Sequence, residues 1–172
     1  GFCVGVVEFS KIIDGKNIQK DNVVIGISSS GPHSNGYSLI RKIIEIQQSN
    51  LQGKFGNTTL GDVLVEPTKI YVRPILDLIE KFSINGIAHI TGGGFKDNIK
   101  RILPNDCDVI INTNTWQQPE IFKWIQNQGN ITKDEMLRTF NCGIGIVLII
   151  EHKDVKEVLD KLAQTGYDSY QI

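Results

Sequence analysis

The most informative stretch of the chain reads Val23-Val24-Ile25-Gly26-Ile27, then Ser28-Ser29-Ser30-Gly31-Pro32-His33-Ser34-Asn35-Gly36-Tyr37-Ser38, then Leu39-Ile40-Arg41-Lys42-Ile43-Ile44. The first run has the apolar, β-branched composition of a strand, and the last has apolar residues at helical spacing. Between them lies a turn rich in hydroxyls and glycine, with an imidazole and a carboxamide. Such a strand–turn–helix corner is suited to anions, because backbone N–H groups and the helix dipole converge there.

Further strands and helices alternate along the chain on both sides of this corner. Apolar runs predict strands over residues 2–9, 22–28, 84–90, 108–113, 145–151 and 167–172. Helical spacing predicts helices over residues 36–49, 66–82, 95–103, 119–128, 133–138 and 155–164. Six strands with interleaved helices are typical of one α/β (α+β) layer structure, so we expect a single domain over residues 1–172.

Local signals refine two of these helices. Pro67 falls in the first turn of the helix expected over 66–82, where its missing N–H costs nothing, whereas Pro74 should kink or split that helix. Thr132 precedes the helix over 133–138, and Glu135 follows three residues later. This is the spacing of a capping box.

Composition excludes several classes of protein. The 172 residues carry 40% hydrophobic and 22% charged residues, with a formal net charge of −1. This balance provides no positive footprint for nucleic acid or an anionic membrane, and no apolar run approaches the roughly 18 residues of a membrane span. The chain opens at Gly1 inside a strand pattern and without Met, which predicts a fragment of a longer chain; a processed complete protein is the alternative.

The cysteines and histidines form no recognisable metal or disulfide pattern. Cys3, Cys107 and Cys142 are odd in number and widely spaced, so we expect small buried side chains in a reducing cytoplasm. The three histidines are also scattered along the chain. We therefore predict no metal site.

The turn after the first buried strand is the leading candidate for a binding site. Ser30, His33, Ser34 and Asn35, together with backbone N–H groups, are suited to a phosphate or a sugar. The alternative is a plain surface turn, in which the Asn35-Gly36 dipeptide favours the turn and Ser34 is the N-cap of the helix.

A second candidate follows the strand over 84–90. Thr91, Gly92, Gly93 and Gly94 form a turn that a ligand can approach, and Asn98 and Arg101 lie one and two turns into the next helix. The glycines have neither the dinucleotide-binding spacing nor a following Gly-Lys-Ser/Thr. A flexible connector and a solvated arginine are the alternatives. His89, just before this turn, is expected to be a buried core histidine.

Two further positions are weaker candidates. Asn141 lies in the turn before the strand over 145–151, next to Cys142, which no neighbouring base in the sequence activates as a nucleophile. Glu66 either binds a ligand or places a favourable negative charge at a helix start. The sequence shows no clustered Asp set for Mg-ATP and no pair of catalytic carboxylates.

Together these stretches resemble the phosphoribosylformylglycinamidine cyclo-ligases, also called aminoimidazole ribonucleotide synthetases, of purine biosynthesis. The resemblance covers nearly the whole chain, in the family's order, and its most specific part is the run Ser-Gly-Pro-His-Ser-Asn-Gly-Tyr-Ser. The matching pieces are Gly1–Glu8, Ile12–Gly15, Ser29–Arg41, Leu64–Val72, Ala88–Phe95 and Arg138–Gly145.

The resemblance is to the family's C-terminal half, and it implies a mixed sheet with helices packed on it. It also implies that ATP and Mg²⁺ are bound mainly by an N-terminal half that this chain lacks. Family members are homodimers, with the active site in a groove between the halves. The implied reaction is ATP-dependent closure of the imidazole ring of a ribonucleotide substrate, and the isolated half is expected to be inactive.

The resemblance also assigns expected roles to individual residues. Ser30, His33, Ser34 and Asn35 would bind the ribonucleotide or the transferred phosphate. Residues 91–94 would line the same groove with Asn98 and Arg101 nearby, while Glu66 and Asn141 are weaker assignments. No general acid or base can be named. The alternatives are a non-catalytic domain that binds a phosphorylated metabolite or a protein partner, and a related enzyme such as formylglycinamidine synthetase.

Overall fold

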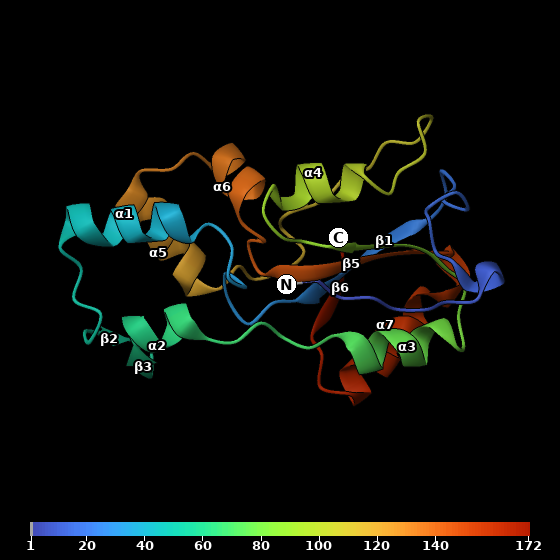
Figure 1. Ribbon diagram of the computed structural model, residues 1–172, viewed down its shortest axis with the longest axis horizontal. Helices are drawn as coiled ribbons and strands as arrows, with labels where there is room; N and C mark the ends of the chain where they lie inside the picture. The colour runs from blue at the N-terminus through green and yellow to red at the C-terminus, as the bar shows by residue number, and fades with distance from the viewer. Residues whose placement is uncertain (1) are drawn as a thin grey trace.

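The computed structural model describes residues 2–172 as a sheet with helices on both faces (Figure 1). The strands are β1 (Val23–Ser28), β2 (Lys54–Phe55), β3 (Thr58–Thr59), β4 (Ile84–His89), β5 (Ile144–Ile150) and β6 (Ser169–Gln171). The α-helices are α1 (Tyr37–Gln47), α2 (Leu60–Val65), α3 (Val72–Ile79), α4 (Gly94–Lys100), α5 (Glu120–Gly129), α6 (Lys133–Thr139) and α7 (Val155–Gln164). Two short 3₁₀ helices span Phe9–Lys11 and His152–Asp154.

Four strands form the main sheet in the order β4-β5-β1-β6, and β2 and β3 form a separate hairpin. All three pairings of the main sheet are antiparallel. The central strand β5 is buried along its whole length, which explains its continuous apolar sequence. Because β1 and β4 each run antiparallel to β5, both strands finish at the same end of the sheet, where β5 begins.

Alternate residues of β5 contribute to two separate cores. Ile146, Leu148 and Ile150 pack with the apolar faces of α3 and α7. Val147 and Ile149 face the opposite core, which includes residues of α1, α4, α5 and α6. Figure 1 shows the same division, with α3 and α7 on one side of the sheet and α4 and α6 on the other. The result is three layers, helix–sheet–helix.

The α/β fold class is confirmed, but two of the six predicted strands were wrong. Residues 2–9 pair with no strand in the described part of the chain, and the side chains of Phe2, Val4 and Val6 are fully exposed. Residues 108–113 are irregular, with Ile110 91% exposed. Periodicity alone cannot supply the neighbouring strand that pairing needs. The structure instead has two short strands, β2 and β3, that pair with each other as a separate hairpin. A mixed sheet was expected, but all pairings of the main sheet are antiparallel.

The helix predicted over residues 66–82 is also corrected. Only 72–79 is helical, as α3, and Pro74 is its third residue. At that position the N–H has no partner within the helix, so proline neither kinks nor splits α3. Pro67 lies in the irregular connection from α2 to α3. At α6 the N-cap prediction is confirmed, because the Thr132 hydroxyl accepts a hydrogen bond from the Glu135 N–H.

Candidate functional site

Residues 29–36, between β1 and α1, form a loop tied to the connection from α2 to α3. The Ser30 N–H donates to Nε2 of His33 at 3.0 Å, and the Ser30 hydroxyl donates to the carbonyl oxygen of Pro67 at 2.7 Å. The Lys69 N–H approaches the same His33 nitrogen at 3.4 Å. Since Nε2 accepts backbone hydrogen bonds, its lone pair is free of a proton, and the ring carries its hydrogen on Nδ1.

His33 is held as a buried, neutral imidazole. Its side chain is 4% exposed, and its Nδ1 has no hydrogen-bond partner among the described residues. Burial is the main reason that the pKa of His33 is lowered to about 4, and the nearby charges of His89 and Lys69 lower it further. The structure thus offers an unpartnered N–H donor inside the predicted loop.

Asn35 joins this loop to the glycine turn. Its Oδ1 accepts a hydrogen bond from the Gly92 N–H at 2.9 Å, while its Nδ2 donates to the His33 carbonyl oxygen at 2.7 Å. A Cβ built on Gly92 would meet only Asn35 Oδ1, at 3.8 Å, so the space in front of this turn is open. The structure therefore brings the first and second predicted stretches together into one site.

Asn98 and Arg101 lie behind the glycine turn. The Asn98 side chain is buried, and its Nδ2 lies at 2.8 Å from the Gly94 carbonyl oxygen and 3.3 Å from those of Thr91 and Gly92. Its Oδ1 lies 3.2 Å from the Thr91 hydroxyl and accepts from Arg101 Nη1 at 3.1 Å. The buried Asn98 thus fixes the shape of the turn from within the protein, whereas Arg101 is exposed and contacts Asn98 from the surface.

The buried side chain of Asn141 holds the loop over residues 29–36 in place. Its side chain is fully buried, and its Oδ1 accepts from the Ser29 hydroxyl and from the Gly143 N–H, both at 2.9 Å. Its Nδ2 donates to the Gly31 carbonyl oxygen at 2.9 Å. These hydrogen bonds engage both ends of the amide with the protein itself, so Asn141 holds the loop in shape.

Ser34 and Glu66 are exposed, as are Gly92 and Arg101 among the other predicted residues. Ser34 is exposed with a positive φ of 59°, and the helix N-cap is Gly36 rather than Ser34, which corrects that alternative. Glu66 is exposed at the C-terminal end of α2, not at a helix start, so the favourable dipole interaction expected for it does not exist.

His89, Cys3 and Cys107 differ from the sequence expectations, whereas Cys142 agrees with its own. His89 is exposed at the end of β4, not buried in the core. Cys142 is buried, and burial raises the pKa of its thiol to about 12, which rules out a resting thiolate nucleophile. Cys3 is exposed and Cys107 half-buried, so of the three cysteines only Cys142 has the expected burial.

Sequence reasoning missed Lys69 and Tyr71, because it assigned both to a helix. The Lys69 ammonium donates to the Ser28 hydroxyl at 2.8 Å, and the Tyr71 hydroxyl donates to the Ser28 carbonyl oxygen at 2.8 Å. The Tyr71 ring lies between the two histidines, with its centroid 6.1 Å from that of His33 and 6.4 Å from that of His89. The matching piece Leu64–Val72 was the available signal for these residues.

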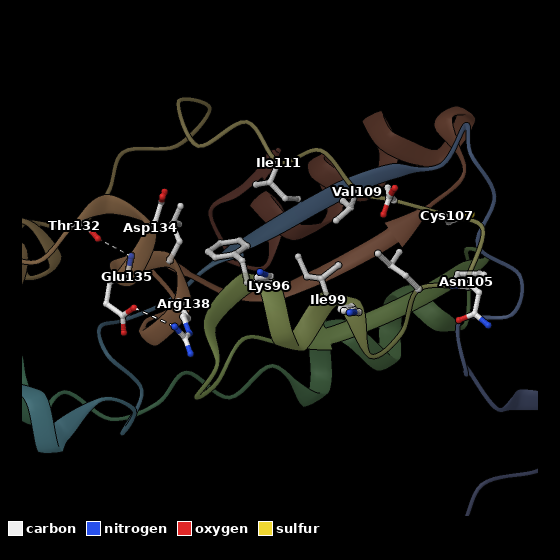
Figure 2. A pocket seen from close by; sticks show the side chains of 16 residues that line it. Lys96, Ile99, Asn105, Cys107, Val109, Ile111, Thr132, Asp134, Glu135 and Arg138 are labelled. Atoms are coloured by element: carbon white, nitrogen blue, oxygen red, sulfur yellow. Dashed lines mark hydrogen bonds and ion pairs between the residues drawn. The ribbon is translucent and has the colours of Figure 1, made fainter.

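A cavity of about 820 Å³ lies between α4, α6 and the segment over residues 104–111 (Figure 2). Its walls include Phe95, Ile99 and Leu103, and none of the predicted site residues lines it. Its rim carries equal numbers of positive and negative side chains: Lys96, Lys100, Arg138, Asp108, Asp134 and Glu135. Within residues 2–172, the unpartnered buried polar atom is in His33 and not here, so we place the candidate site at the loops.

The comparison with known families covers the whole of this site. Residues 19–172 match the family described as AIR synthase related protein, C-terminal domain. The chain belongs to this family. The match includes all twelve predicted site residues, from Ser30 to Asn141, whereas residues 2–18 precede it. Membership of the AIR synthase related family accounts for the fold and supports the general resemblance, without distinguishing the cyclo-ligase from related members.

No group of three or more His, Cys, Asp or Glu side chains that could hold a metal ion occurs within residues 2–172. In the same part of the chain, no helix has the length and apolarity needed to cross a membrane.

Proposed function

We propose that this chain forms the substrate-binding half of a phosphoribosylformylglycinamidine cyclo-ligase. The observation that carries the proposal is the contact of Asn35 with the Gly92 N–H, which joins the two most polar loops at one end of the sheet. Membership of the AIR synthase related family and the Ser29–Arg41 sequence support the choice of the cyclo-ligase within that family.

In this proposal the loops bind the ribonucleotide, and each part has a defined task. Ser34 and the open backbone at Gly92 contact the ligand, because both are accessible. His33 donates a hydrogen bond from Nδ1, and it remains uncharged near neutral pH because its pKa is about 4. Asn98 and Asn141 hold the two loops in place without touching the ligand.

The reaction closes an imidazole ring at the expense of ATP. The formamide oxygen of the ribonucleotide attacks the γ-phosphorus of ATP and ADP leaves; a nitrogen of the same substrate then attacks the activated carbon, and phosphate leaves with the former formamide oxygen. An N-terminal half binds ATP and Mg²⁺ in this proposal, and two copies form a homodimer in a reducing cytoplasm. The three described cysteines are free thiols, in keeping with such a compartment.

The proposal is tested by joining residues 1–172 to the N-terminal half of a cyclo-ligase and assaying ATP-dependent formation of aminoimidazole ribonucleotide. We expect activity from the joined protein and none from the isolated chain. His33→Ala and Asn35→Ala should abolish the activity while the far-UV circular dichroism spectrum is unchanged. Full activity of both variants would contradict the assignment of the site.

Binding calorimetry separates the cyclo-ligase from a non-catalytic domain and from formylglycinamidine synthetase. The chain is titrated with formylglycinamidine ribonucleotide, with formylglycinamide ribonucleotide and with unrelated phosphorylated metabolites. The proposal predicts the tightest binding for the first of these. Equal affinity across the panel would favour a general phosphometabolite-binding domain.

A further inference from the structure

A cluster of cationic and aromatic side chains lies next to the candidate site, at the end of β1 and β4. The Lys69 ammonium donates to the Ser28 hydroxyl at 2.8 Å and stands over the Tyr167 ring, 5.6 Å from its centroid. The Tyr167 ring also packs against Tyr71, with 6.0 Å between their centroids. These contacts hold a half-buried lysine at a fixed position on the protein.

The positive charge of this cluster has no acidic partner. Lys69 forms none of the ion pairs found in the described residues, all of which are on the surface elsewhere. Lys69 supplies this positive charge, because burial lowers the pKa of His89 and disfavours its charged form. Lys69 is half-buried and has no carboxylate partner among the described residues, so its positive charge is available to an anionic ligand.

The cluster is also rich in hydrogen-bond donors that the protein does not use. The Ser28 hydroxyl accepts from Lys69 and has no acceptor of its own among residues 2–172, and His89 makes no side-chain hydrogen bond there. The buried Nδ1 of His33 lacks a partner as well. A phosphate monoester has only acceptor oxygens and about two negative charges, so it complements this set.

We propose that Lys69, Ser28 and His89 form a binding site for the phosphate monoester of a sugar phosphate, with Lys69 as its fixed positive charge. Tyr71 positions the site, because its hydroxyl holds the Ser28 carbonyl oxygen. The inference rests on the proposed function in one respect, that the ligand of the loops carries a phosphate. It adds a named anchor for that phosphate, at residues outside the sequence-predicted site.

The test is a titration of residues 1–172 with inorganic phosphate at constant ionic strength. Nuclear magnetic resonance of the backbone amides and histidine rings monitors the binding. We expect saturable shifts at Ser28, Lys69 and His89. Lys69→Met should weaken binding by about tenfold or more, the loss typical of a charge-assisted hydrogen bond, while Lys69→Arg should retain it within about threefold. Lys81→Met removes an exposed lysine after α3 and serves as the matched control.

Lys69→Gln keeps a polar end near Ser28 and provides a second variant if Lys69→Met unfolds. Phosphate affinity that is the same in the wild type and in every folded Lys69 variant would overturn the inference, as would shifts confined to other surfaces. A second titration uses formylglycinamidine ribonucleotide. Binding of phosphate without the ribonucleotide contradicts the proposed function and supports the Lys69 site. Ribonucleotide binding that is unaffected by Lys69→Gln supports the function and contradicts the site.

Discussion

Asn35 accepts a hydrogen bond from the N–H of Gly92 at 2.9 Å, although 57 residues separate them in the chain. The same carboxamide donates to the carbonyl oxygen of His33, so one side chain sets the distance between two loops. Because the loops follow the ends of β1 and β4, on either side of β5, the order of the sheet makes this contact possible. The candidate site is thus a product of topology as well as of local sequence.

Asn141 should be essential for stability. Asn141→Ala would leave the Gly31 carbonyl and the Gly143 N–H without partners in a fully buried place, and we expect a loss of about 3 kcal/mol in the free energy of unfolding. Ser29→Ala removes one of these hydrogen bonds and should cost about 1 kcal/mol. Urea denaturation measures both. A smaller loss in the free energy of unfolding for Asn141→Ala than for Ser29→Ala would show that Asn141 does not hold the loop.

His33 should make stability depend on pH. Its pKa is about 4 in the folded chain, against 6.5 for an unperturbed histidine, so the unfolded chain binds more protons between these values. Stability is therefore complete above pH 6.5 and falls as the pH drops toward 4, by up to about 3 kcal/mol. His33→Gln should lose this part of the pH dependence in urea denaturation at pH 7, 6 and 5.

His89 also has a lowered pKa because of partial burial, so its effect has the same sign. The comparison is therefore made between the wild type and His33→Gln, in which His89 is unchanged. Parallel curves of stability against pH for the two proteins would show that His33 is not the titrating group.

Cys142 should be unreactive in the folded protein. Its thiol is buried with a pKa of about 12, whereas Cys3 is exposed. With iodoacetamide at pH 8 we expect rapid alkylation of Cys3 and none of Cys142 until urea unfolds the chain. Mass spectrometry of the peptides identifies the modified residue. Alkylation of Cys142 at a rate comparable with that of Cys3 would contradict the structure.

Gly94 should be irreplaceable, in contrast to Gly92. Gly94 has a φ of 57°, and a Cβ there would collide with the carbonyl oxygen of Leu137 in α6. Gly94→Ala should therefore destabilise the fold by about 2 kcal/mol or more. Gly92→Ala meets only Asn35 Oδ1, at 3.8 Å, and should leave stability nearly unchanged. Urea denaturation compares the two, and equal effects would exclude this explanation of the glycine turn.

The periodicity of apolar residues predicted the strands and helices whose formation depends on burying an apolar face. The strand β5 and the helices α1 and α7 lie close to their expected places, since an apolar run or stripe predicts them directly. Residues 2–9 and 108–113 have the same apolar character but no neighbour to pair with in the described chain. Strand formation depends on such a neighbour, so the local sequence could not show that these two segments are not strands.

Two of the predicted stretches meet in the structure, but the sequence did not indicate what the carboxamides of Asn98 and Asn141 contact. Asn98 and Asn141 were expected near the ligand, and both are buried and bonded to backbone groups. Lys69 was missed altogether, because a proline-containing segment that connects α2 and α3 was taken for a helix. Which side a side chain faces depends on long-range packing, which the sequence pattern does not contain.

Whether the loops bind the ribonucleotide is measured by titrating the chain with formylglycinamidine ribonucleotide and following its backbone amides by nuclear magnetic resonance. We expect saturable shifts at Ser34, Asn35, Gly92 and Gly93. Asn35→Ala should weaken binding by about tenfold or more, while Asn50→Ala, at an exposed turn, has no effect. A ribonucleotide that binds elsewhere, or that binds Asn35→Ala as tightly as the wild type, would contradict binding by the loops.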